Sequence, residues 1–210
     1  MKFKSKYDIL QVVKSGMFLP YYRYMYENFA ASDTEEFFQS NLKTQPPDWK
    51  WRTKPVRYIY NSQKYRCPEW ENIDWSASII VFGGSDMMGI GVDESETISS
   101  CLQNVTGIPV INLGISGSSM LFNLHNMLQY FAGERPTPRG VFVLWPHHSR
   151  ICAYEANWIE AYGHWNAAEG GLFDLYNNDP TNSTVCAIQH ARMANILWQD
   201  TKYISASLFS

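Results

Sequence analysis

The sequence has few of the features that mark metal-binding, disulfide-rich, nucleic-acid-binding or membrane-spanning proteins. Its four cysteines are widely spaced with no Cys-x-x-Cys pair, which disfavours a zinc site and a disulfide scaffold. The net charge of −3 gives no electrostatic reason to expect a nucleic-acid partner. No run approaches the ~18 apolar residues of a membrane span, and no apolar N-terminal segment resembles a signal peptide. We therefore expect a cytoplasmic chain with no membrane contact, metal or cofactor.

The length of 210 residues suits one α/β domain with a full core. We expect residues 58–210 to form this domain and residues 1–57 to form an extension of helical and irregular structure. The extension is densely aromatic at residues 21–29, and Ser32 or Asp33 is placed to cap a helix. Because so many aromatic side chains would otherwise be exposed, we expect the extension to pack on the sheet edge or to contact another copy of the chain, or a virion if a phage encodes it.

Basic and aromatic residues alternate at residues 49–52 and 57–60. This mixture suits single-stranded nucleic acid or sugars, but it serves equally well in packing or in an interface, which is the interpretation we prefer.

Three short apolar runs have the composition of buried β-strands: residues 79–82, 110–113 and 141–145. Helical patterns follow the first two. One begins with the acidic residues after Asp93 and places Ile98, Cys101, Leu102 and Val105 on one face, with Cys101 expected in the core. Strands that alternate with helices predict parallel β-α-β crossovers. The sequence therefore predicts a three-layer α/β/α fold with a mostly parallel sheet, of the SGNH/flavodoxin-like kind.

Ser85 follows the first strand directly after Gly83 and Gly84. In parallel sheets, ligands bind at the carboxyl ends of the strands, so a serine delivered to this edge on a glycine turn is a candidate nucleophile. The alternative is a Gly-Ser turn that carries no chemistry.

The residues around Ser85 resemble the first motif of the SGNH hydrolases, the GDSL-type esterase and lipase superfamily. In that motif a strand ends in a small-residue turn with the nucleophilic serine, followed by spaced glycines and an acidic stretch; here these are Gly89, Gly91, Asp93 and Glu94. Residues 110–119, VINLGISGSS, are similar to the second motif, and residues 60–70 to the Asn, Arg and Glu lead-in of bacterial and phage members.

This resemblance covers about residues 60–150 and implies a serine esterase or carbohydrate deacetylase that acts on a small-molecule or carbohydrate ester. It implies that Ser85 is the nucleophile. It also implies that the backbone N–H groups of Ser85 and Gly114 form the oxyanion hole.

The third family motif places an asparagine after the third strand, and this chain has Trp-Pro-His-His-Ser-Arg at residues 145–150 instead. By position, His147 takes the place of the asparagine as a donor to the oxyanion, and either His147 or His148 could act as the base. We expect Asp86 and Arg150 to contact the substrate, with Arg150 suited to a bidentate contact. The alternatives are that His147 and His148 are surface or core histidines without a catalytic role, and that Arg150 caps a helix.

The final family motif, Asp-x-x-His, supplies the general base, and this spacing is absent from the 210 residues. The chain is therefore truncated relative to a longer parent, or is a degenerate member with a structural or binding role, or uses another histidine. The remaining histidines that could act as the base are His125, His164 and His190. We expect His125 to be partly buried and His190 to begin a helix that covers about residues 191–199. We expect a strand at residues 203–208.

Residues 151–182 are rich in aromatic side chains and are expected to form a long loop. Such a loop would cover the crevice at the carboxyl ends of the strands and bind a carbohydrate or acyl group there. The alternative is a local packing cluster.

Overall fold

The structure, a computed structural model, describes residues 2–4, 9–19, 35–53, 56–155, 158–163 and 179–207. The aromatic run at 21–29, the candidate cap at Ser32 or Asp33, and His164 lie outside the described residues.

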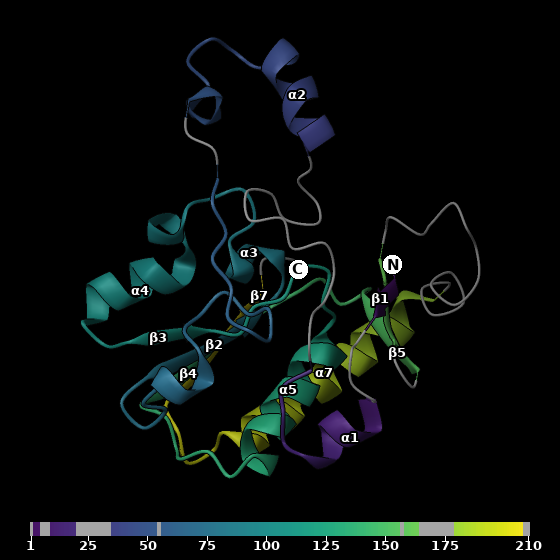
Figure 1. Cartoon of the computed structure of the whole chain (residues 1–210). Helices are drawn as coiled ribbons and strands as arrows, with labels where there is room; N and C mark the ends of the chain where they lie inside the picture. The colour runs from purple at the N-terminus through teal and green to yellow at the C-terminus, as the bar shows by residue number, and fades with distance from the viewer. Residues whose placement is uncertain are drawn as a thin grey trace.

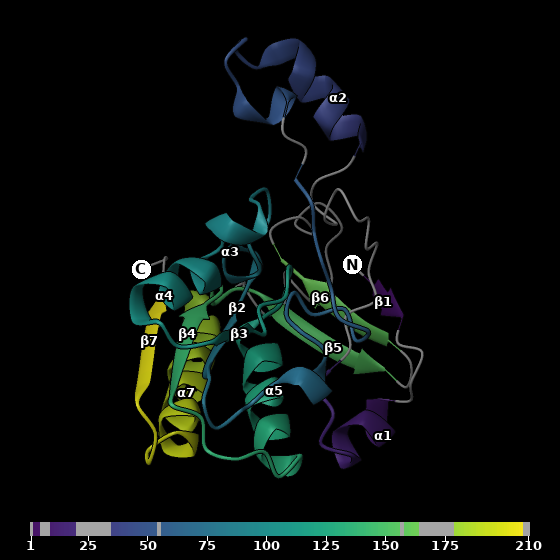
Figure 2. The same ribbon diagram turned by 60° about the vertical axis from the view of Figure 1, so that its left-hand side comes forward.

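Among the described residues, four parallel strands form the central sheet in the order β3-β2-β4-β7 (Figures 1 and 2). Their bounds are β2 (Ile79–Gly83), β3 (Val110–Asn112), β4 (Gly140–Trp145) and β7 (Tyr203–Ser207). All four are strands that the sequence predicts, and β2, β3 and β4 are short runs made mainly of β-branched and aromatic residues between breakers. The predicted α/β fold with a mostly parallel sheet is confirmed.

Helices cover the two faces of this sheet unequally. The helices α5 (Met120–Ala132) and α7 (Pro180–Leu197) lie on one face, below the strands in Figure 1, and α4 (Ile98–Thr106) lies on the other. Strand side chains alternate accordingly: Phe82 and Val143 belong to the large core that includes Trp198, whereas Val81 and Leu144 pack on the α4 side.

A second sheet replaces much of the long loop expected at residues 151–182, so that expectation is wrong for its first part. Strands β5 (Ile151–Glu155) and β6 (Trp158–Tyr162) pair antiparallel, and β1 (Lys2–Lys4) adds to β6. The two strands are rich in Ile, Tyr and Trp and are separated by two residues, which is the pattern of a hairpin.

Helix α7 is longer than the sequence predicts, so His190 lies within it and does not begin a helix. Pro180 is its first residue, and the Asp179 side chain accepts a hydrogen bond from the Thr181 N–H at 2.8 Å. A polar N-cap followed by proline is a common helix start, but the polar residues that follow carry little apolar periodicity.

The N-terminal part of the chain contributes α1 (Ile9–Lys14), α2 (Glu35–Thr44) and the short 3-10 helix η1 (Lys50–Arg52). Phe18 and Leu19 are fully buried in the main core. By contrast, α2 stands away from the sheets (Figures 1 and 2) and contains no buried residue.

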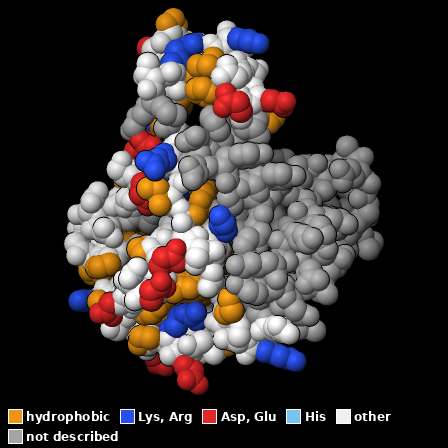
Figure 3. Space-filling model, viewed as in Figure 1, with side chains coloured by type: hydrophobic (Ala, Val, Ile, Leu, Met, Phe, Trp, Pro, Cys, Tyr) orange, Lys and Arg blue, Asp and Glu red, His pale blue; other side chains and the backbone are white. Residues whose placement is uncertain are grey.

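Two further 3-10 helices are η2 (Trp70–Asn72), whose Trp70 packs against Phe18 and Trp75, and η3 (Glu94–Glu96), which precedes α4. Charged side chains of both signs are scattered over the described surface in Figure 3. Of the described helices, none has the length and apolar character needed to cross a membrane.

Candidate functional site

Ser85 is the first residue of the four-residue helix α3 (Ser85–Met88), immediately after the turn that ends β2. Its side chain is half-buried. A Cβ atom on Gly83 would lie 2.8 Å from the Leu144 carbonyl oxygen, so only glycine lets the turn pass this close to β4. A Cβ on Gly84 would lie 3.3 Å from Pro146 Cβ. The serine turn therefore lies directly against the loop that follows β4.

That loop carries the two adjacent histidines. The His147 Nδ1 atom accepts a hydrogen bond from the Ser149 N–H at 3.2 Å and lies 2.7 Å from Ser149 Oγ. Because Nδ1 acts as an acceptor, the neutral ring carries its proton on Nε2. The rings of His147 and His148 stack with centroids 4.4 Å apart.

Arg150 and Asp86 both lie beside the serine turn. Arg150 Nη1 would be 3.5 Å from a Cβ on Gly84. Burial lowers the pKa of Arg150, and the Asp86 carboxylate opposes this shift, which places the two charges near each other. Asp86 is exposed. The structure thus brings the predicted substrate-binding pair to the same edge of the sheet as Ser85.

His148 lines a pocket of about 340 Å³ between the ends of β4 and β7 and the helices α5 and α7. Trp145, Ala187 and Ile188 give the pocket an apolar character. The indole Nε1 of Trp145 is buried and has no hydrogen-bond partner among the residues that the structure describes. The pocket therefore has mainly apolar walls.

The N–H of Gly114 is engaged within the protein: it donates to Asn112 Oδ1 at 2.9 Å. Asn112 in turn donates to the Met87 carbonyl oxygen at 2.8 Å. A Cβ on Gly114 would lie 2.7 Å from the backbone nitrogen of Met88, so glycine is needed here for the close approach of the β3 loop to α3. Sequence reasoning missed Asn112, although its place in the second motif was a signal.

The next part of this loop is hydrogen-bonded to the turn that precedes Ser85. The Ile115 N–H and the Ser118 hydroxyl both donate to the Gly83 carbonyl oxygen, at 3.0 and 3.1 Å. Gly117 lies between them in a left-handed conformation, with φ of 76°. Within the described part of the chain, the Gly117 N–H has no hydrogen-bond partner.

A buried arginine fixes the segment after Ser85. Arg66 donates to Glu94 Oε2 at 2.7 Å, to the Gly89 carbonyl oxygen at 2.7 Å and to the Val92 carbonyl oxygen at 3.0 Å. Its guanidinium also lies 4.9 Å from the centre of the Tyr58 ring. The arginine of the lead-in therefore holds the spaced glycines and the acidic stretch of the first motif in place.

The other described histidines lie in the helices. The His125 ring packs edge-on against Tyr154 with centroids 5.3 Å apart, and burial lowers the pKa of both His125 and His190. The prediction that His125 is partly buried is confirmed.

No hydrogen bond joins the Ser85 hydroxyl to any side chain in the described ranges. The described residues also contain no cluster of three or more His, Cys, Asp or Glu side chains suited to a metal ion.

No protein-family model matches the sequence, and no curated protein matches it. Part of the chain is similar to solved structures of AlinE4, described as an SGNH-hydrolase family esterase. The crystal structure of AlinE4 matches with 25% identity over 35% of this chain and 42% of that chain, with a TM-score of 0.29. An aspartate-to-alanine mutant of AlinE4 matches with 18% identity over 64% of this chain and 60% of that chain, with a TM-score of 0.38. The chain thus spans less than two thirds of these neighbours, which are SGNH-hydrolase family esterases.

Proposed function

We propose that this chain is an SGNH-like serine hydrolase, an esterase or carbohydrate deacetylase, with Ser85 as its nucleophile. The observation that carries the proposal is the position of Ser85 at the carboxyl end of the central strand β2, beside the histidine-bearing loop after β4. Parallel sheets bind ligands at this edge, and acyl transfer needs a hydroxyl and an imidazole near each other.

In the proposed reaction, Ser85 Oγ attacks the ester carbonyl carbon while its proton passes to a base. The tetrahedral intermediate collapses, the alcohol leaves with that proton, and water then releases the acyl group by the same steps. We assign the base to His148, which lines the pocket beside the ends of β4 and β7. The tautomer of His147 supports a different role, because its Nε2–H can donate to the oxyanion.

Two backbone N–H groups would donate to the oxyanion, one from Ser85 itself and one from the loop after β3. The Ser85 N–H belongs to the first turn of α3, where no carbonyl oxygen of the helix accepts it. The resemblance assigns the second donor to Gly114, whose N–H would first have to leave Asn112. Gly117 is the stronger candidate on geometry, since the flanking residues Ile115 and Ser118 bind the Gly83 carbonyl oxygen.

Asp86 and Arg150 would orient the substrate from the rim of the site. The guanidinium of Arg150 suits a carboxylate, phosphate or sugar hydroxyl, and Asp86 suits a hydroxyl donor. Both side chains are compatible with a carbohydrate ester.

A second candidate function is a binding protein on a catalytically degenerate SGNH-like fold. It is favoured by the engaged N–H of Gly114 and by the absence of a hydrogen bond from the Ser85 hydroxyl to any described side chain. A fold alone does not guarantee its usual chemistry.

Hydrolysis of p-nitrophenyl acetate separates these candidates. We expect the 210-residue chain to hydrolyse the ester, Ser85→Ala to reduce the rate to background, and Ser95→Ala, an exposed serine on η3, to leave it unchanged. His148→Gln removes the base and lowers kcat, whereas His147→Ala removes an oxyanion donor and lowers kcat by roughly 10²–10³. A folded wild-type chain with only background hydrolysis would support the binding protein instead.

A further inference from the structure

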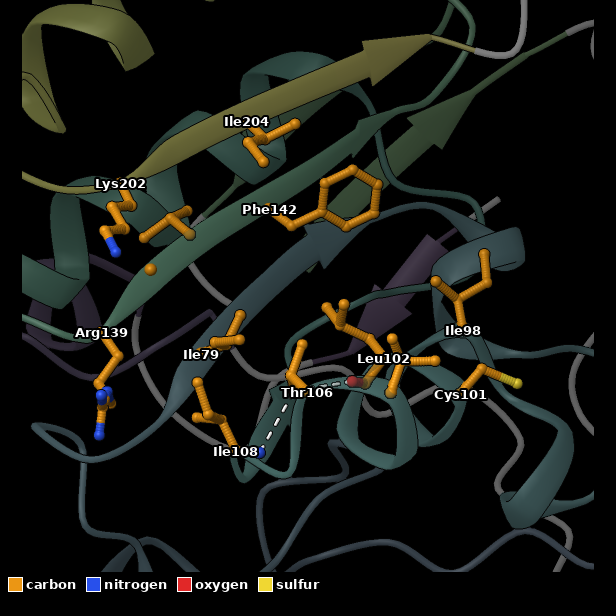
Figure 4. Close-up of a pocket in the computed structure, with 13 residues that line it drawn as sticks. Ile79, Ile98, Cys101, Leu102, Thr106, Ile108, Arg139, Phe142, Lys202 and Ile204 are labelled. Atoms are coloured by element: carbon orange, nitrogen blue, oxygen red, sulfur yellow. Dashed lines mark hydrogen bonds between the residues drawn. The ribbon is translucent and has the colours of Figure 1, made fainter.

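A large apolar groove in the described structure lies on the face of the central sheet that α4 covers only in part. This groove, here named the α4 groove, has a volume of about 650 Å³ between α4 and the strands β4 and β7 (Figure 4). Its walls are mainly aliphatic and aromatic, with Ile79 and Phe142 from the sheet and Leu102 from α4.

The groove exists because this face lacks a second helix among the described elements. Parallel sheets normally have both faces covered, but α4 packs beside β2 and β3 and leaves β4 and β7 open. The exposed fraction is 65% for Ile204 on β7 and 86% for Val105 on α4. Cys101 is exposed as well and lines the groove, so the prediction that it lies in the core is wrong. A contiguous apolar surface of this kind is typical of a binding site.

Two cations stand at one end of the α4 groove. Arg139 and Lys202 directly precede β4 and β7, and Figure 4 shows both at the same side of the groove, opposite Ile98 and Cys101. Both are exposed, and neither forms an ion pair with a carboxylate of the described residues. The groove is thus an apolar channel with a positive end.

We propose that the α4 groove binds a free fatty acid with an acyl chain of about twelve carbons. The acyl chain would lie along Ile79, Phe142 and Ile204, and the carboxylate would meet Arg139 and Lys202. The positive end matches a ligand with one anionic head and one apolar chain, because both cations lie at the same end and the remaining lining is mostly uncharged.

The size of the groove favours a small molecule over a protein helix. Its volume of about 650 Å³ falls within the range of roughly 300–1,000 Å³ that small-molecule sites occupy. A helix is ~10 Å wide with a pitch of ~5.4 Å, so a single turn already fills about 400 Å³. The site is also separate from the proposed active site, since Arg139 and Lys202 precede parallel strands whereas Ser85 follows one.

Isothermal titration of the 210-residue chain with dodecanoate below its micelle concentration tests the proposal. We expect saturable binding at one site. Dodecyltrimethylammonium, with the same chain and a cationic head, is expected to bind at least tenfold more weakly to the same wild-type protein, a comparison that needs no variant.

Matched variants then locate the site. The double variant Arg139→Glu, Lys202→Glu and the single variant Ile204→Asp are each expected to weaken dodecanoate binding at least tenfold. The controls Arg192→Glu and Phe37→Asp change exposed residues on α7 and α2, away from the groove, and should leave binding unchanged.

Three results would overturn the proposal. Equal affinity for dodecanoate and dodecyltrimethylammonium would mean that the cations recognise no carboxylate. A concentration-dependent dimer that Ile204→Asp abolishes, without dodecanoate binding, would identify a second copy as the occupant. Binding to vesicles of anionic phospholipid, with none to dodecanoate, would identify a membrane surface.

Discussion

Arg66 shows how a single buried residue fixes the segment that carries the candidate nucleophile. Its side chain is completely buried, and it donates hydrogen bonds to one carboxylate and to backbone carbonyl oxygens of the loop after α3. A planar guanidinium can reach these acceptors together, because its donors are fixed in a fork. The conformation of residues 88–94 therefore depends on arginine in particular.

We predict that Arg66→Lys lowers the free energy of unfolding by about 2–4 kcal/mol, because one ammonium group leaves several buried carbonyl oxygens without a donor. The measurement is urea denaturation followed by circular dichroism. The control is Lys50→Gln, which removes the exposed ion pair with Glu96 and is expected to cost less than about 1 kcal/mol. Equal losses in the two variants would contradict the role of Arg66.

The position of Ser85 could be predicted from the sequence, but the state of its neighbours could not. A strand, two glycines and a serine are consecutive, so local rules suffice to place them. By contrast, the N–H of Gly114 is bound by the side chain of Asn112, and that contact depends on how the β3 loop packs against α3. The exposure of Cys101 likewise depends on which elements cover α4.

At the scale of elements, β2, β3 and β4 were predictable because each consists mainly of consecutive apolar residues. The hairpin of β5 and β6 and the first half of α7 were not predicted. In the hairpin, β6 pairs with β1 from the other end of the chain, which no local pattern reveals. In α7, the first residues after Pro180 are polar, and the helix depends on its N-cap and on packing against α5.

Two partly buried histidines, on α5 and α7, predict how the stability of the chain depends on pH. Burial lowers the pKa of His125 on α5 and of His190 on α7 below the ordinary value of 6.5. The unfolded chain then binds protons more readily than the folded chain once the pH drops below about 6.5. Stability from these groups is therefore complete above that pH and falls as the pH drops toward the lowered values.

We expect the thermal unfolding temperature of the wild-type chain to decrease as the pH is lowered from about 7 to about 5. This range lies above the pH values at which carboxylates titrate. The double variant His125→Gln, His190→Gln should show a shallower fall over the same range, whatever its midpoint at neutral pH. Differential scanning fluorimetry in matched buffers measures both slopes. Parallel curves for the two proteins would contradict this origin of the pH dependence.

For the whole molecule, the parallel sheet places the candidate chemistry at the carboxyl ends of the strands and the positive end of the α4 groove at their amino ends. Because β2 lies between β3 and β4, the loops after these strands meet at Ser85, and those loops carry Gly117 and the two histidines. The same parallel arrangement puts Arg139 and Lys202 at the opposite ends of the strands. The sequence predicted parallel strands, but not which strands are neighbours, since pairing depends on contacts between distant residues.

The central claim is that Ser85 is a nucleophile, and covalent labelling tests it most directly. The intact chain is incubated with a fluorophosphonate, and its mass is compared with those of Ser85→Ala and Ser95→Ala treated alike. We predict one adduct on the wild-type chain and on Ser95→Ala, located at Ser85 by peptide mass spectrometry, and none on Ser85→Ala. A folded wild-type chain that takes no label, or an adduct that persists in Ser85→Ala, would contradict the claim.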